Sequence, residues 1–97
     1  MEYFDFGDGK VPAHKHPNGG GWVADTATVE DTVYVSEIAR VYGSAQVSGS
    51  AQVLDIARVS GNARVYGGAR VSGSAQVLGN AWVYGDAWVF GNAMVYD

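Results

Sequence analysis

The sequence contains no cysteine, which excludes disulfide bonds and cysteine-ligated metal sites. Its 97 residues include only two prolines, and 47% of them are hydrophobic, a fraction too high for a disordered linker. The formal net charge is −4, so there is no overall basic signal for nucleic acid or for an anionic membrane. We therefore expect a single folded domain with neither a nucleic-acid nor a membrane partner.

Long hydrophobic runs are also missing. The first residues, MEYFDFGDGK, do not combine a basic start with an apolar stretch, as a signal peptide would. No later segment has the roughly 20 consecutive apolar residues that a transmembrane helix needs. We expect neither a signal peptide nor a transmembrane segment.

The sequence is instead dominated by a period of six residues. A small residue, nearly always alanine, follows four positions after almost every member of one uninterrupted valine series. Such a period over about three quarters of a chain is typical of a β-solenoid. The valines are Val23, Val29, Val35, Val41, Val47, Val53, Val59, Val65, Val71, Val77, Val83, Val89 and Val95.

Each hexad, A-x-V-x-G-x, predicts one short strand and one corner. Side chains two apart in a strand point to the same face, so alanine and valine are expected inside and the residue between them outside. Glycine, followed by Ser, Asn, Asp or Gly, suits a corner because these residues accept positive φ most readily.

Three hexads close a triangular coil of 18 residues. The segment 37–41, EIARV, returns 18 positions later as DIARV in 55–59, and Asn62 and Asn80 are also 18 apart. From Val23 to Val95 this makes about four coils, a shaft of roughly 20 Å at the usual strand spacing. The predicted fold is all-β, a single-stranded parallel β-helix over 22–97 behind an irregular N-terminal cap in 1–21.

The repeat resembles the hexapeptide-repeat family of left-handed parallel β-helices. The aliphatic and small positions match throughout 23–95, but the family's second position fits only at Ala24 and Glu30. The strings ARVYGS, ARVSGN and AWVYGD, after a GGGWV entry, are more similar to bacteriophage and prophage repeat proteins that lack a catalytic loop. The resemblance implies a left-handed coil and a place in the host cytoplasm or the virion. A right-handed solenoid of the bactofilin kind is the alternative.

The N-terminal segment is predicted to cap the solenoid, because an open strand edge promotes aggregation. Tyr3–Phe6 and Lys10–Val11 fit a hairpin with Asp8-Gly9 as its turn. Its aromatic side chains are expected to cover the first coil, and Pro12 is expected to end the second strand.

The only histidines are His14 and His16. In the resembled family, acyltransferases use a histidine base and γ-class carbonic anhydrases bind zinc through three histidines. This implies the alternative function, a minimal acyltransferase-like or γ-carbonic-anhydrase-like enzyme with these residues at a subunit boundary. We favour solvated loop residues in the cap, because the chain has no third histidine and the repeat has no insertion to form a lid or cleft. No catalytic, cofactor-binding or metal-binding residue is predicted.

Charged residues on the repeat do not converge on a site. Asp25, Asp31 and Glu37 fall at three different corners, where their carboxylates point apart rather than toward one Ca²⁺. The arginines form a belt around the shaft and not the continuous basic groove that nucleic acid needs. They are Arg40, Arg58, Arg64 and Arg70.

The last coil carries large side chains at its outward and corner positions. So much exposed aromatic surface predicts an interaction site, although the same side chains are also able to lie flat and shield the coil. We expect a homo-oligomer, either the side-by-side trimer that the resemblance implies or an end-to-end dimer, or a protein partner at this coil. The favoured function is thus a non-enzymatic structural or interaction protein of phage or prophage origin. The predicted surface is Trp82, Tyr84, Trp88, Phe90, Met94 and Tyr96.

Overall fold

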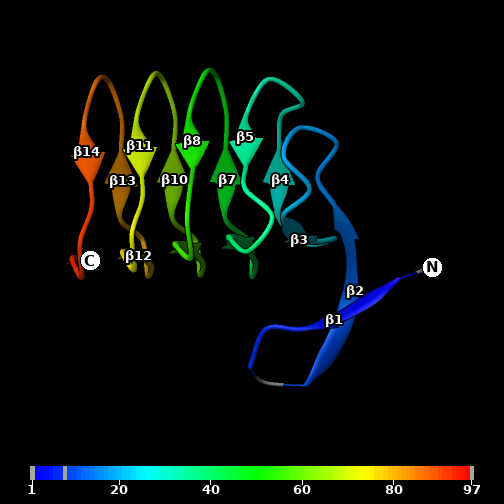
Figure 1. The fold of residues 1–97 in the computed structure, drawn as a ribbon. Coiled ribbons are helices and arrows are strands. Elements are labelled where there is room, and N and C mark those ends of the chain that lie inside the picture. The colour runs from blue at the N-terminus through cyan, green and yellow to red at the C-terminus, as the bar shows by residue number, and fades with distance from the viewer. Residues whose placement is uncertain (1, 8, 97) are drawn as a thin grey trace.

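The computed structural model describes residues 2–7 and 9–96, and all the regular structure in them is β (Figure 1). An N-terminal hairpin of β1 (Tyr3–Asp5) and β2 (Lys10–Lys15) leads into a stack of coils measuring, with the hairpin, 35 × 25 × 19 Å. The coils contain β3 (Trp22–Ala24) and twelve strands of two residues each. These are β4 (Thr28–Val29), β5 (Tyr34–Val35), β6 (Arg40–Val41), β7 (Gln46–Val47), β8 (Gln52–Val53), β9 (Arg58–Val59), β10 (Arg64–Val65), β11 (Arg70–Val71), β12 (Gln76–Val77), β13 (Trp82–Val83), β14 (Trp88–Val89) and β15 (Met94–Val95).

The solenoid strands form three parallel sheets, one for each face of a triangular shaft. Their orders are β3-β6-β9-β12-β15, β4-β7-β10-β13 and β5-β8-β11-β14. Every pair joins residues 18 apart, as Val41 with Val59 and Arg64 with Trp82. The predicted triangular β-solenoid of about four coils is therefore confirmed.

Backbone hydrogen bonds connect each coil to the one that follows it. The N–H of Arg40 donates to the carbonyl of Ala57 at 3.1 Å, and the N–H of Tyr42 donates to the carbonyl of Val59 at 2.9 Å. The same step of 17 residues recurs down the stack as far as Leu78, which donates to Val95. The outward residue of each strand thus depends on the next coil for its partner.

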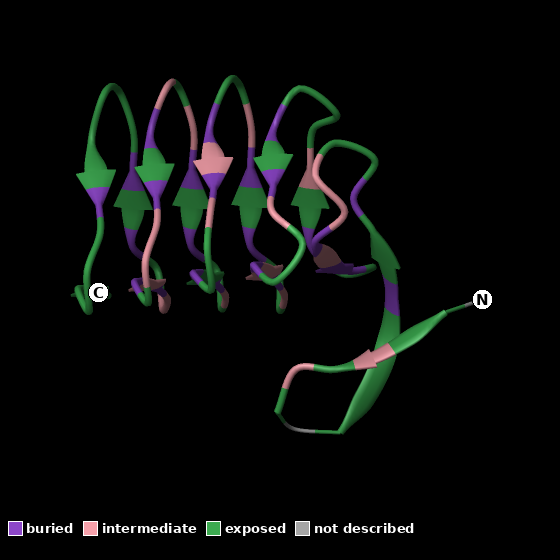
Figure 2. Cartoon of the chain, in the orientation of Figure 1, coloured by how far each residue is buried: buried purple, intermediate pink, exposed green. Residues whose placement is uncertain are grey.

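The hydrophobic core is a column of valine and alanine inside the triangle. Every inward valine from Val35 to Val77 is essentially inaccessible, and so are the alanines from Ala39 to Ala75 (Figure 2). Removing this apolar surface from water is the main source of stability, since two-residue strands cannot persist alone. The predicted inward positions are confirmed over these coils.

Close backbone approach explains the corner glycines. Gly61 has φ +65°, and a Cβ atom there would lie 2.9 Å from the backbone nitrogen of Gly79 on the next coil. Asp55 replaces glycine at one corner with φ 57°, and its carboxylate accepts a hydrogen bond of 2.9 Å from the N–H of Gly73. Aspartate is among the residues that tolerate this conformation.

The predicted N-terminal hairpin is confirmed by antiparallel pairing of β1 with β2, while Asp8 of its expected turn lies outside the described residues. The expectation that Pro12 ends the second strand is wrong, because β2 runs through it. Pairing of β2 with β3 begins one residue later, at Ala13 opposite Ala24. The missing N–H of Pro12 thus falls at the end of that ladder, where proline is tolerated.

The cap covers the first coil in two separate ways. Phe4 stacks on Trp22 and Phe6 on Tyr42, both with ring centroids 4.9 Å apart, so these rings cover the outer side of the first coils and not their end. The end is covered on two of its three faces, on one by β2, which pairs with β3, and on another by the loop after β2, which lies against β5. In that loop Asn18 accepts a hydrogen bond from the N–H of Val35 at 3.0 Å.

We predict that Val59→Asp lowers the free energy of unfolding by about 3 kcal/mol or more, because it buries a charge with no partner. Urea denaturation measures the loss. Gln46→Asp introduces the same charge on an exposed strand position and is expected to change stability by less than about 0.5 kcal/mol. Equal effects of the two variants would contradict the inward assignment of valine.

We predict that Gly61→Ala destabilises the protein more than Gly91→Ala does. Both glycines have φ +65°, so both substitutions carry the same backbone strain of about 1 kcal/mol. Only at Gly61 does the added methyl meet the next coil, since nothing lies within 4 Å of the position at Gly91. The difference between the two melting temperatures isolates the contribution of close coil stacking, and equal losses would argue against it.

Candidate interaction surface

In residues 2–7 and 9–96, the C-terminal coil contains the last strand of each of the three sheets. β13, β14 and β15 each pair with one strand only, namely β10, β11 and β12. In earlier coils the backbone N–H of the outward residue donates to a carbonyl of the next coil, as Arg64 does to Ala81. Among the described residues, no further coil offers such a carbonyl to Trp82, Trp88 or Met94. Within the described residues, β13, β14 and β15 are therefore the last strands of the three faces.

The hydrophobic core is open at this same end. Ala87 and Ala93 are exposed and Val95 is half-buried, although the equivalent inward residues one coil earlier are fully covered (Figure 2). The sequence pattern placed these three side chains inside, which is correct for their direction but not for their exposure. The signal that distinguishes them is that no described residue follows 18 positions later to cover them.

The predicted aromatic surface is brought together around the open end. Its six side chains retain between 56% and 71% of their accessible surface, which is unusual for tryptophan and phenylalanine. They occupy all three faces of one coil, so they form a rim and not a stripe. The rim consists of Trp82, Tyr84, Trp88, Phe90, Met94 and Tyr96.

Side chains of the preceding coil support the rim from one side. The guanidinium of Arg64 lies 5.5 Å from the ring centroid of Trp82, and that of Arg70 lies 5.1 Å from that of Trp88. Tyr84 stacks on Tyr66 at 5.3 Å with an interplanar angle of 10°. These contacts fix the rings in place, since cation–π and stacked pairs each contribute roughly 0.5–1.5 kcal/mol. Two arginines of the predicted belt are therefore held by tryptophans.

Two of the three faces carry the same outward ladder. One reads Gln46, Arg64, Trp82 along β7, β10 and β13, and the other reads Gln52, Arg70, Trp88 along β8, β11 and β14. The third face ends in Met94 instead of tryptophan. Within 79–96 the sole charged residue is Asp86, so the end of the shaft is nearly neutral.

The two histidines contact different partners. His16 is 2% exposed, and its Nε2 lies 2.7 Å from the carbonyl oxygen of Val33, which identifies this nitrogen as the donor. His14 is exposed, with Nδ1 2.7 Å from the carboxylate of Asp25. The expectation that both are solvated loop residues is wrong for His16, which is buried at the end of the first coil, and for His14, which is exposed but lies in β2. Sequence alone gave no signal for this, because the residue lies outside the repeat.

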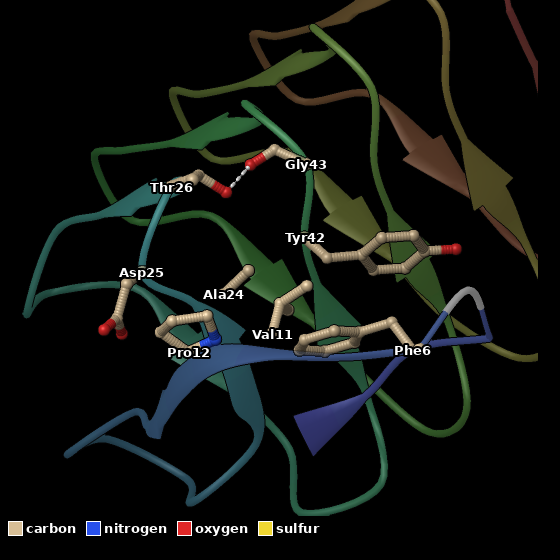
Figure 3. A pocket seen from close by; sticks show the side chains of 9 residues that line it. Phe6, Val11, Pro12, Ala24, Asp25, Thr26, Tyr42 and Gly43 are labelled. Atoms are coloured by element: carbon tan, nitrogen blue, oxygen red, sulfur yellow. Dashed lines mark hydrogen bonds between the residues drawn. The ribbon is translucent and has the colours of Figure 1, made fainter. Parts of the chain in front are cut away.

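An apolar cavity of about 350 Å³ lies between the hairpin and the first coil (Figure 3). Phe6, Val11, Pro12, Ala24 and Tyr42 form most of its wall, with Asp25 at its edge. Thr26 donates a hydrogen bond to the carbonyl of Gly43 beside it. This cavity was not anticipated from the sequence, since it depends on where the hairpin folds back.

No cluster of three or more side chains suited to bind a metal ion occurs in residues 2–7 and 9–96. Of the three acids predicted at first-coil corners, Asp25 faces His14. In the same residues no helix is long and apolar enough to cross a membrane.

Comparison with known proteins gives one partial match. A family model described as YdcK Beta solenoid repeat matches residues 57–73, which form one coil in the middle of the shaft. No curated protein and no solved structure matches the chain. The match supports a β-solenoid repeat and agrees with the fold described above.

We predict that His16→Ala lowers the free energy of unfolding by about 1–3 kcal/mol, because it removes a buried imidazole and leaves the Val33 carbonyl unpaired. His14→Ala removes an ion pair whose partners are about half exposed, so its loss is expected to stay below about 1 kcal/mol. Chemical denaturation of both variants measures this. A greater loss for His14→Ala would contradict the capping role of His16.

Proposed function

We propose that this chain is a non-enzymatic structural and interaction protein, a stiff β-solenoid that self-associates through its C-terminal coil. The observation that carries the proposal is the exposed rim of six large side chains on the last described coil, which retain between 56% and 71% of their accessible surface. Exposed apolar patches of this kind mark surfaces that contact another chain.

The two ends of the shaft differ in a way that supports this function. At the N-terminal end, β2 pairs with β3, the 16–21 loop bonds to Val35 of β5, and the His16 imidazole bonds to the Val33 carbonyl, so two of the three faces are covered. At the other end, the described residues present bare edges surrounded by aromatic side chains. Aromatic residues are enriched at protein interfaces, where their large area is buried at low entropic cost.

Closed symmetry is the arrangement that covers such an end without building fibres. Head-to-tail stacking is opposed on two faces, where β2 pairs with β3 and the 16–21 loop bonds to Val35, whereas on the third face β4 pairs with β7 alone among the described residues. A second copy meeting the first end to end covers the rim on all three faces. A side-by-side trimer would cover one face of each copy and leave the ends open.

An origin in a phage or prophage is part of the proposal and rests on the repeat strings ARVYGS, ARVSGN and AWVYGD. A short rigid shaft with one adhesive end suits a virion component or a host-directed attachment protein. The enzymatic alternative gains no support, because His14 and His16 engage separate partners and neither faces the rim.

We predict that the intact protein is a dimer. The double variant Trp82→Ser, Trp88→Ser is expected to raise the dissociation constant of that dimer by at least about tenfold, so that more of the protein is monomeric at a given concentration. Light scattering over a range of concentrations measures the shift.

The matched control is Ile38→Ser, Ile56→Ser, which removes two exposed apolar side chains from corners of earlier coils. Its mass is expected to equal that of the unmodified protein. A protein that is monomeric at tens of micromolar, or an equal shift in the control, would contradict self-association through the C-terminal coil.

A further inference from the structure

The segments 37–41 and 55–59, EIARV and DIARV, lie directly above one another on adjacent coils, because β6 pairs with β9. Both depart from the hexad in the same way. The corner residue two positions before the outward one is Thr, Ser, Asn, Asp or Gly in the other repeats, but it is Ile38 in one of these segments and Ile56 in the other. A departure that recurs at one corner of two neighbouring coils distinguishes this part of the shaft from the rest.

The two segments border a trough of about 350 Å³ on the face formed by β6, β9 and β12. Its apolar side is unusually open, since Ile38 and Ile56 retain 56% and 51% of their accessible surface. The trough lies on the middle coils and does not depend on the last one. Its wall consists of Ile38, Ile56 and Ser74 along the corner and Arg40, Arg58 and Gln76 along the strands.

The two arginines of the trough are not neutralised. Arg40 lies directly opposite Arg58 on the neighbouring strand, about 4.8 Å away along the shaft, and like charges in this position repel. The one salt bridge formed among residues 2–7 and 9–96 lies elsewhere, in the cap. The carboxylate of Asp55, in one of the two segments, instead accepts a hydrogen bond from the backbone N–H of Gly73. The pair therefore lacks an anion.

The two guanidinium groups are held differently. Arg40 lies under the ring of Phe4, 4.7 Å from its centroid, and its Nε is buried with no acceptor among the described residues. Arg64 and Arg70 each lie against a tryptophan, but Arg58 is exposed and forms no cation–π contact in the described part of the chain. One side of the pair is thus fixed in place, while the other is able to adjust to a ligand.

We propose that this trough binds a small organic carboxylate, with its head between Arg40 and Arg58 and its apolar body on Ile38 and Ile56. Arginine recognises a carboxylate through paired N–H donors, and a bound anion relieves the repulsion between the two side chains. Small-molecule sites combine an apolar wall with a few polar groups in this manner. The site goes beyond the proposed function, because it does not involve the aromatic rim.

Titration followed by two-dimensional NMR tests the site with three probes at constant ionic strength. We expect sodium hexanoate to shift the backbone amide signals of 38–40 and 56–58 with saturation. Acetate has the same head and four fewer methylene groups, each worth up to about fourfold in affinity, so it is expected to bind at least about tenfold more weakly. 1-Hexanol has the apolar body without the charge, and we expect a loss of similar size.

Equal affinity for hexanoate and hexanol would overturn the role of the arginines. Equal affinity for hexanoate and acetate would overturn the role of the isoleucines, and either result defeats the proposal. So does the absence of a saturable shift with hexanoate up to about 50 mM, since a site of this kind is expected to bind in the millimolar range or more tightly.

Arg58→Gln is expected to weaken hexanoate binding by at least about tenfold, because it removes the charge that closes on the carboxylate. The matched control is Arg64→Gln, which removes the same charge from a face where the neighbours are Gln46 and Trp82. Its affinity for hexanoate is expected to stay within about twofold of the unmodified protein. Equal losses in the two variants would indicate general attraction of anions to the shaft and would overturn the site.

Thermal unfolding without ligand tests the unneutralised pair separately. At low ionic strength we expect Arg58→Gln to raise the melting temperature, because it removes a repulsion, and Arg64→Gln to lower it, because it removes a contact with Trp82. Hexanoate is expected to raise the melting temperature of the unmodified protein and to leave that of Arg58→Gln unchanged. A lower melting temperature for Arg58→Gln would contradict the repulsion on which the proposal depends.

Discussion

Each coil of this protein depends on the coil after it. The hydrogen bond from residue i to the carbonyl of residue i+17 recurs along the whole shaft, and no strand beyond β3 is longer than two residues. Strands this short have no independent stability. Stability is therefore the sum of coil-to-coil interfaces, and a coil without a neighbour loses its hydrogen-bond partners and the cover over its valines together.

This dependence makes the ends of the solenoid more informative than its middle. The central coils all pack in the same way, because small inner residues and corner glycines allow close stacking, as at Gly61. At the N-terminal end, the repeat is replaced by an antiparallel strand, a glycine-rich loop and one buried histidine. At the C-terminal end, the repeat itself changes composition, and its outward positions become tryptophan and methionine.

The period of the sequence was sufficient to predict the fold of the repeat, because a strict hexad constrains every inward position. Val59 inside, Arg58 outside and their pairing with residues 18 away were all readable from spacing alone. The cap was predictable only as a hairpin. Its passage through Pro12, the burial of His16 and the cavity beside Tyr42 depend on contacts between a unique segment and the repeat, and such contacts leave no period to read.

The candidate surface was partly predictable for the same reason. The six rim residues stand out as a change of composition at known outward positions. The exposure of Ala87 and Ala93 did not stand out, since the pattern assigns direction and not cover. The arginine–tryptophan contacts follow from the period and the fold together, because outward residues 18 apart on one face become neighbours once the coils stack.

The hydrogen bonds of this shaft run parallel to its long axis, with consequences for how it carries force. Tension between the two ends loads the bonds of every coil interface in series, so the shaft is expected to separate at its weakest interface. Compression and bending instead press the stacked valines and the close glycine backbones against one another. A shaft built this way resists compression and bending better than it resists tension.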